Sequence, residues 1–244
     1  MHRFFVPTPF AEKMQIVGMD AHHICKVLRM QSGQHLQLVS SDGVTALMEI
    51  ESVTASAAFV RFVSYLASSS EPAVKLVLAQ GLAKGEKMDF VVQKAVEIGV
   101  SRIIPLALEY SVVQLDAAKA EKKVARWQKI AAEAAKQCKR DLVPLVEPVI
   151  NLRELLAKEH ATLRLLASES EQQVGLKQVL QSGGKTDEIL LIVGPEGGIA
   201  PAELKLAEDS GVYAISLGKR ILRTETAGLV AAAAIFYETG DLGG

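Results

Sequence analysis

From residue 74 to residue 217 the chain alternates short apolar runs with stretches of helical periodicity. A helix is predicted over residues 86–98, with apolar side chains on one face and a glycine, Gly99, at its end. Strands that alternate with helices favour an α/β domain, in which a mostly parallel sheet is covered on both faces. Because knots are very rare, the pattern by itself predicts an unknotted, doubly wound sheet. The expected strands cover residues 74–79, 102–106, 145–149, 163–167, 189–193 and 212–217.

The first 70 residues have a different pattern, with little helix and several strand-like runs. Asp20 can cap a short helix that reaches Met30, and Asp42-Gly43 is a strong signal for a hairpin turn. We therefore expect a small β-barrel with one helix. A polar linker over residues 67–72 then separates two domains, 1–70 and 73–244. The expected strands of the barrel cover residues 3–6, which suit an edge strand, 34–39, 44–50 and 58–66.

The composition excludes several classes of protein. The 244 residues are 49% apolar and 23% charged, which is ordinary for a folded soluble chain. The N-terminus lacks the apolar run of a signal peptide, and the longest apolar run, residues 227–237, is about half the ~20 residues that span a bilayer. We therefore expect a cytoplasmic protein. Cys25 and Cys138 are isolated and lack metal or redox spacing, so we expect free thiols and no metal site.

A basic block lies between residues 119 and 140, where eight Lys and Arg residues accompany two Glu residues in a chain of net charge −1. A long helix is predicted over residues 119–139, with a buried stripe on one side and cations on the other. Such a face can bind a polyanion, and it is also typical of an ordinary solvated helix. The predicted stripe is Val124, Trp127, Ala131, Ala134 and Cys138, and the outward cations are Arg126, Lys129, Lys136, Lys139 and Arg140.

Polar or glycine-rich segments follow three of the expected strands, after Ala167, Val193 and Leu217. Ligands of parallel sheets bind at the carboxyl ends of the strands, so these three segments are candidates for one site. The loop at residues 194–198, Gly-Pro-Glu-Gly-Gly, can bend tightly and offer bare backbone to a ligand. Glu196 would repel a phosphate, and phosphate-loop spacings are absent. A neutral or cationic ligand fits better, with a plain strand-to-helix turn as the alternative.

The last part of the chain joins charge to a very apolar helix. Arg223 and Glu225 can point away from the anchoring Ile221 and Leu222, either as functional groups or as a surface ion pair. The following run, residues 227–236, is apolar on all sides, and such a helix is expected to be buried all round. It is predicted to be central to the domain or part of a subunit interface.

The combination of GPEGG at residues 194–198 with LGKRILRTETA at residues 217–227 resembles the signature of the bacterial 16S ribosomal RNA (uracil-N3)-methyltransferases, of the SPOUT superfamily. Weaker likenesses extend over nearly the whole chain, at residues 2–5, 23–29, 84–85, 94–100 and 126–137. The resemblance implies a PUA-like N-terminal barrel that binds RNA. It also implies a deep trefoil knot near residues 190–226, in place of the unknotted sheet.

The same resemblance implies S-adenosylmethionine as cofactor and methyl transfer to N3 of one uridine in the decoding region. Because N3 of uracil is a poor nucleophile until its proton leaves, we hypothesise that Arg223 stabilises the uracil anion. Glu225 is a candidate proton acceptor that could instead only hold Arg223. The implied cofactor-binding residues are Leu166, Ala167, Ser168, Glu169, Gly194, Pro195, Glu196, Gly197, Gly198, Leu217, Gly218, Ile221, Leu222 and Thr226.

The implied partners are the small ribosomal subunit and a second copy of the chain, as a homodimer. Three alternatives stay open: a SPOUT methyltransferase with another RNA target, a non-catalytic protein of ribosome assembly, and a Rossmann-type nucleotide-binding enzyme. The predicted RNA-binding residues are Arg3, His23, Lys26, Arg29, Lys84, Lys87, Lys94, Gln137 and Arg140.

Overall fold

The structure is a computed structural model that describes residues 1–41, 43–54, 56–66, 70–182, 184 and 186–243. Its chain divides into two units, one of Met1–Glu71 with Ala135–Val143 and one of Pro72–Ala134 with Pro144–Gly244. Residues 135–143 thus belong with the N-terminal unit, although they lie far beyond the predicted linker at residues 67–72. Asp42 of the predicted hairpin turn and residues 67–69 of the predicted linker lie outside the described residues.

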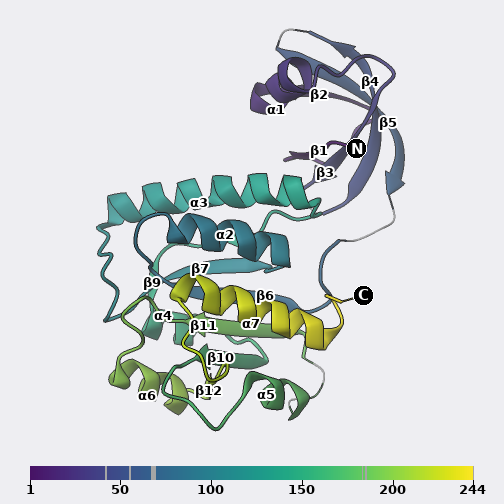
Figure 1. The fold of residues 1–244 in the computed structure, drawn as a ribbon. Helices are drawn as coiled ribbons and strands as arrows, with labels where there is room; N and C mark the ends of the chain where they lie inside the picture. Colours follow the sequence, from purple (N-terminus) through teal and green to yellow (C-terminus); the bar gives the residue numbers. More distant parts are fainter. Residues whose placement is uncertain (42, 55, 67–69, 183, 185, 244) are drawn as a thin grey trace. The chain divides into compact units, whose positions relative to one another are not determined.

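The first unit is built on a curled five-stranded sheet in the order β1-β3-β4-β5-β2 (Figure 1). β1 lies at an edge, as predicted, and pairs in parallel with β3. The strand β2 was not predicted, and the helix after it consists of a short α-turn followed by a π-turn. The elements are β1 (Arg3–Val6), β2 (Lys13–Val17), α1 (Gly18–His22), η1 (His23–Val27), β3 (His35–Ser40), β4 (Thr45–Val53) and β5 (Ala57–Leu66).

The second unit contains the predicted parallel sheet, in the order β12-β10-β11-β6-β7-β8 with β9 also paired to β7. Every pairing described in this sheet is parallel, which confirms the prediction. The sheet places β10, β11 and β12 side by side, so their carboxyl ends meet at one edge. The strands are β6 (Lys75–Gly81), β7 (Arg102–Ala107), β8 (Leu145–Val146), β9 (Ile150–Asn151), β10 (Leu163–Ala167), β11 (Glu188–Val193) and β12 (Tyr213–Ile215).

Helices cover both faces of this sheet (Figure 1). On one face α7 packs on α2, β6 and β11, and on the other α4 and α6 share an apolar core with the central strands. Asn151 caps α4 through a reciprocal pair of hydrogen bonds with Glu154, both 3.0 Å. The helices are α2 (Lys87–Ile98), α3 (Ala117–Cys138), α4 (Leu152–Lys158), α5 (Leu176–Ser182), α6 (Pro201–Asp209) and α7 (Thr224–Thr239).

The long helix α3 buries most of its predicted stripe. Trp127 is 2% exposed, and its indole Nε1–H donates to Asp89 Oδ1 at 3.0 Å. The prediction of an outward-facing side chain was wrong for two of the cations, because each forms an ion pair with a carboxylate of the first unit. Lys136 forms an ion pair with Asp20 at 2.7 Å, and Arg140 is buried against Glu71.

Within this chain the C-terminal helix α7 is buried on one face and exposed on the other, so it is not enclosed by its own domain, and its predicted place in a subunit interface stays a prediction. Its small residues, such as Gly228 and Ala231, lie against the sheet, while Val230 and Tyr237 are 44% and 70% exposed. None of the helices in the described ranges is long and apolar enough to cross a bilayer. The trefoil knot implied by the resemblance stays a prediction.

Candidate active site

One open pocket of about 1330 Å³ lies at the carboxyl ends of β10, β11 and β12. It is lined by the segments that follow these strands and by Lys87 from the start of α2. Small-molecule sites usually measure about 300–1,000 Å³, so this pocket has room for a small ligand and part of a second one. The three segments that the sequence singled out are thus brought together.

Most of the predicted cofactor-binding residues line this pocket, but three do not. Leu166 is 1% exposed and lies in the core beneath the pocket. Gly197 lies against Tyr110, since a Cβ on Gly197 would be 2.8 Å from the carbonyl oxygen of Tyr110. Thr226 is exposed outside the lining. The predicted residues in the lining are Ala167, Ser168, Glu169, Gly194, Pro195, Glu196, Gly198, Leu217, Gly218, Ile221 and Leu222.

Glu196 ties the glycine-rich loop to the start of α2. Its Oε1 accepts a hydrogen bond from the backbone N–H of Lys84 at 3.0 Å and lies 3.1 Å from the Lys87 ammonium. Partial burial raises the pKa of the Glu196 carboxyl, but the Lys84 N–H and the Lys87 ammonium outweigh it, so the pKa lies below its ordinary value. Glu196 is therefore a carboxylate at neutral pH and holds the loop in place.

Arg223 lines the pocket just before α7 begins, whereas Glu225 lies outside the lining and reaches the site through its contact with Lys87. The Arg223 guanidinium is 83% exposed and 4.0 Å from Glu225 Oε1, whereas the Glu225 side chain is only 16% exposed. Lys87 Nζ lies 3.2 Å from Glu225 Oε2, so one ammonium bridges Glu196 and Glu225. Its contacts with Glu196 first, and with Glu225, raise the pKa of the Lys87 ammonium.

The charge state of Glu225 follows from these contacts. Burial raises the pKa of the Glu225 carboxyl, but hydrogen bonds from its own backbone N–H and from Lys87, with the charge of Arg223, lower it further. Glu225 is thus an ionised acceptor at neutral pH, while the exposed Arg223 is available to an anion.

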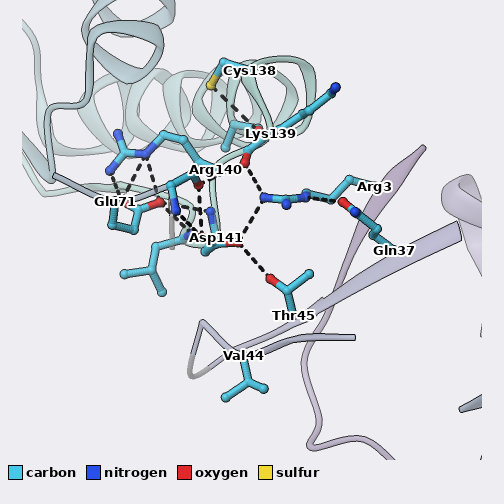
Figure 2. Close-up of polar contacts among 12 residues, drawn as sticks. Arg3, Gln37, Val44, Thr45, Glu71, Cys138, Lys139, Arg140 and Asp141 are labelled. Carbon is cyan, nitrogen blue, oxygen red and sulfur yellow. Dashed lines mark hydrogen bonds and ion pairs between the residues drawn. The ribbon is translucent and has the colours of Figure 1, made fainter. Parts of the chain in front are cut away.

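Two of the predicted RNA-binding arginines are engaged inside the first unit (Figure 2). Arg3 donates to Gln37 Oε1 at 3.1 Å, to Asp141 Oδ1 at 3.0 Å and to the carbonyl oxygen of Lys139. The Arg140 guanidinium is held by the Glu71 carboxylate. Both side chains are therefore largely removed from solvent, at 9% and 5% exposure.

The other predicted RNA-binding residues vary in their surroundings. His23, Lys26 and Arg29 are exposed along and just after η1, and Gln137 is exposed near the end of α3. In the second unit Lys84 is exposed, and Lys94 forms an ion pair with Glu97 at 2.8 Å. The assignment of all nine to RNA binding stays a prediction.

Some pocket residues carried no signal in the sequence. The polar segment of residues 170–173 and Ser216 lies in the lining, but its composition is that of any surface loop. Thr224 lines the pocket as the first residue of α7 and was not singled out. Across the described ranges no group of three His, Cys, Asp or Glu side chains is placed to hold a metal ion.

Comparison with known proteins matches each of the two units to a known domain family. A family model described as an RNA methyltransferase domain matches residues 70–236, and one described as an RNA methyltransferase PUA domain matches residues 18–63. The ribosomal RNA small subunit methyltransferase E of Bacillus subtilis is 38% identical over 240 residues, which span 96% of this chain and 93% of that protein. The protein of the same name from Mesomycoplasma hyopneumoniae is 30% identical, over 94% of this chain and 96% of its own length.

A solved structure is similar over the whole chain. The ribosomal RNA small subunit methyltransferase E from Neisseria gonorrhoeae, bound to S-adenosyl methionine, superimposes with a TM-score of 0.87 at 31% identity over 97% of each chain. The curled N-terminal sheet is thus PUA-like, and the parallel α/β unit is a methyltransferase domain, as the resemblance implied. The chain therefore belongs to the ribosomal RNA small subunit methyltransferase E family.

Proposed function

We propose that this chain transfers a methyl group from S-adenosylmethionine to N3 of one uridine in the decoding region of 16S ribosomal RNA. One observation carries the proposal: a single pocket joins the glycine-rich loop to the segment that bears Arg223, beside Glu225 and Lys87. Family membership supplies the reaction class, and the pocket supplies groups suited to it.

The lining of the pocket fits this cofactor better than a phosphate ligand. Gly198 and Gly218 have φ angles of 75° and 113°, a region that suits glycine and leaves the backbone open to a ligand. The carboxylates of Glu169, Glu171 and Glu196 surround the pocket and suit a cationic group. When bound, S-adenosylmethionine supplies an electrophilic methyl group on its cationic sulfonium.

The side chains at the mouth of the pocket suit the uracil half of the reaction. N3 of uracil carries a proton at neutral pH and becomes a good nucleophile only when that proton leaves. In this proposal the exposed Arg223 stabilises the negative charge that develops on O2 and O4 of the base. Glu225, an ionised acceptor, takes the N3 proton or holds Arg223 in place. Since N3 lies on the Watson–Crick edge, the uridine is unpaired or extruded when it reacts.

The PUA-like unit is proposed to hold the surrounding RNA. His23, Lys26 and Arg29 are exposed there and can contact phosphates, which position an enzyme without selecting sequence. A homodimer is part of the same proposal. The exposed face of α7 is apolar at Val230 and Tyr237 and borders a groove against α5, and such a patch suits burial against a second copy.

The proposal is tested on small ribosomal subunits from cells that lack this methylation. The subunits are incubated with the protein and S-adenosylmethionine, and the 16S RNA is then reverse-transcribed. N3 methylation blocks base pairing, so a single new stop at a decoding-region uridine is expected. Cofactor binding with a stop elsewhere would mean that the enzyme methylates another nucleotide. Absence of cofactor binding would refute the whole proposal and favour a non-catalytic role.

A pair of arginine variants tests the assigned chemistry. Arg223→Ala should lower the rate of methylation by at least about a hundredfold at saturating cofactor, because one electrostatic contact to a developing anion is worth roughly that much. Arg153→Ala removes another exposed arginine, from α4, and should leave the rate unchanged. Near-normal turnover of Arg223→Ala with cofactor binding intact would refute the role given to Arg223.

A further inference from the structure

A buried chain of hydrogen bonds joins the end of β6 to two parts of the active site. Gln80 is fully buried, and its Nε2 donates to the Thr224 hydroxyl at 2.9 Å. The Thr224 hydroxyl in turn donates to the carbonyl oxygen of Gly194 at 2.6 Å. Thr224 is 7% exposed and is the first residue of α7, while Gly194 begins the glycine-rich loop.

The hydrogen-bond chain from Gln80 to Gly194 requires a hydroxyl group at position 224. The group at Thr224 accepts one hydrogen bond and donates another, which hydroxyls do and methyl groups cannot. Gln80 is held at a cost, since its buried Oε1 has no hydrogen-bond partner among the described residues. Its donor end is fixed, because Nε2 donates to the Thr224 hydroxyl and, at 3.3 Å, to the carbonyl oxygen of Gly81.

The backbone around Gln80 is closely packed against the glycine-rich loop and against α7. A Cβ on Gly81 would lie 2.5 Å from the nitrogen of Pro195 and 2.7 Å from the carbonyl carbon of Gly194, so the end of β6 touches the glycine-rich loop directly. A Cβ on Gly228 would lie 3.1 Å from Gln80 Oε1, so α7 approaches the same side chain closely. The loop and the start of α7 are therefore both fixed against the end of β6.

We propose that Thr224, held by Gln80, is the positioning residue that sets the cofactor loop and the Arg223–Glu225 segment relative to each other. Thr224 lies between Arg223 and Glu225 in the chain, so a displacement of Thr224 moves both. Its hydrogen bond to Gly194 ties that segment to the loop that is proposed to hold the cofactor. The inference rests on the proposed function, and it gives neither Thr224 nor Gln80 a contact with the reacting atoms.

The test compares Thr224→Val, which removes only the hydroxyl, with Thr224→Ser, which keeps it. Three quantities are measured: the Kd for S-adenosylmethionine by calorimetry, the rate of methylation at saturating cofactor, and hydrogen exchange of residues 194–200. For Thr224→Val we expect a Kd about tenfold higher and a rate about tenfold lower, the effect of one lost hydrogen bond on each. Exchange in the loop should accelerate, and Thr224→Ser should restore all three to within about twofold.

Thr239→Val is the matched control, because it also removes a threonine hydroxyl from α7, at the far end of the helix. That hydroxyl donates to the carbonyl oxygen of Phe236 and to the Asp241 carboxylate. The Thr239→Val variant should change none of the three quantities. If Thr224→Val does not fold, Gln80→Met replaces it, since it leaves the hydroxyl in place and removes its donor. We expect smaller changes in the same directions.

A merely structural role makes a different prediction. Thr224→Val would then unfold at a lower temperature but keep the wild-type Kd, loop exchange and saturated rate below that temperature, which would overturn the inference. Failure of the proposed function is separable, because it would appear as a wild-type protein that methylates no ribosomal RNA. The Kd and exchange measurements would still decide whether Thr224 positions the loop.

Discussion

Removing the Asp141 carboxylate should destabilise the PUA-like unit more than any surface substitution. Asp141 is 4% exposed and accepts hydrogen bonds from three residues of that unit (Figure 2). Its Oδ1 lies 3.0 Å from the Arg3 guanidinium and 2.7 Å from the Thr45 hydroxyl. Its Oδ2 accepts from the backbone N–H of Ser70 at 2.6 Å and from the Ser70 hydroxyl at 3.0 Å. These contacts join the segment of residues 135–143 to β1 and β4.

The magnitude follows from the buried partner that Asp141→Ala leaves behind. The Arg3 side chain is 9% exposed, so the substitution strands a positive charge with little access to water. Breaking a buried ion pair in this way costs roughly 3–5 kcal/mol, and the lost hydrogen bonds are part of the same total because the contacts form one network. A typical domain has only about 5–15 kcal/mol of stability, so we expect a marginally folded unit.

The assay is native-state hydrogen exchange of the amides in β4, which pairs with β3 and β5. The free energy of opening of these amides should fall by about 3–5 kcal/mol in Asp141→Ala. Asp209→Ala is the control, because Asp209 is 63% exposed in a pair with Lys205, and such a pair contributes under about 1 kcal/mol. A loss of less than about 1 kcal/mol in Asp141→Ala would refute the reasoning.

The pH dependence gives a second check. Burial raises the pKa of the Asp141 carboxyl, but the hydrogen bonds from Ser70 and Thr45 and the charge of Arg3 outweigh it, so the folded pKa lies below the ordinary value of 3.8. The stabilisation is therefore fully present above the unfolded pKa and is lost as the pH falls through the folded pKa. The difference between wild type and Asp141→Ala should be constant from pH 7 to about pH 5 and shrink in stronger acid.

Two further substitutions test the pocket itself. Gly81→Ala places a methyl carbon 2.5 Å from the nitrogen of Pro195, where no flexible side chain can yield, so the loop must shift. We expect at least about tenfold weaker binding of S-adenosylmethionine by calorimetry, and an unchanged Kd would contradict the close approach. Lys87→Met removes the ammonium that helps to hold the pKa of Glu225 below its ordinary value of 4.5. The pKa of the Glu225 carboxyl, followed in a carbon-detected NMR titration, should be higher in the variant than in the wild type. An unchanged pKa would show that Lys87 does not lower it.

The fold of the second unit was largely predictable because its signals are local. The apolar runs predicted β6, β7, β10 and β11 to within two residues, and Gly99 marked the end of α2 correctly. The strand β2 was missed because Lys13–Val17 alternates polar and apolar residues over only five positions between proline-rich and glycine segments. Its place at the edge of the sheet depends on pairing with β5, whose residues lie forty or more positions away in the sequence.

The active site was predictable to the level of segments but not of contacts. Glycine and charge beside buried strands identified the three loops that line the pocket, since only such loops can shape a ligand site at the strand ends. Gln80 and Thr224 carried no comparable signal, because a glutamine at the end of a strand and a threonine at the start of a helix are common everywhere. Their importance arises from a 2.9 Å contact between residues 144 positions apart.

The arginines show most clearly that the number of cations in a sequence does not predict which of them are exposed. Arg3, Arg140 and Arg223 were all assigned to nucleic acid or its reaction, yet only Arg223 presents its guanidinium to solvent, at 83% exposure. The difference lies in the carboxylates that the fold brings near: Asp141 and Glu71 enclose the first two, whereas Glu225 stands 4.0 Å from the third and is shared with Lys87. A polyanion gains most from cations whose charge is not already neutralised. The electrostatic contribution to RNA binding should therefore come from exposed groups such as Lys26 and Arg29, and much less from the buried arginines.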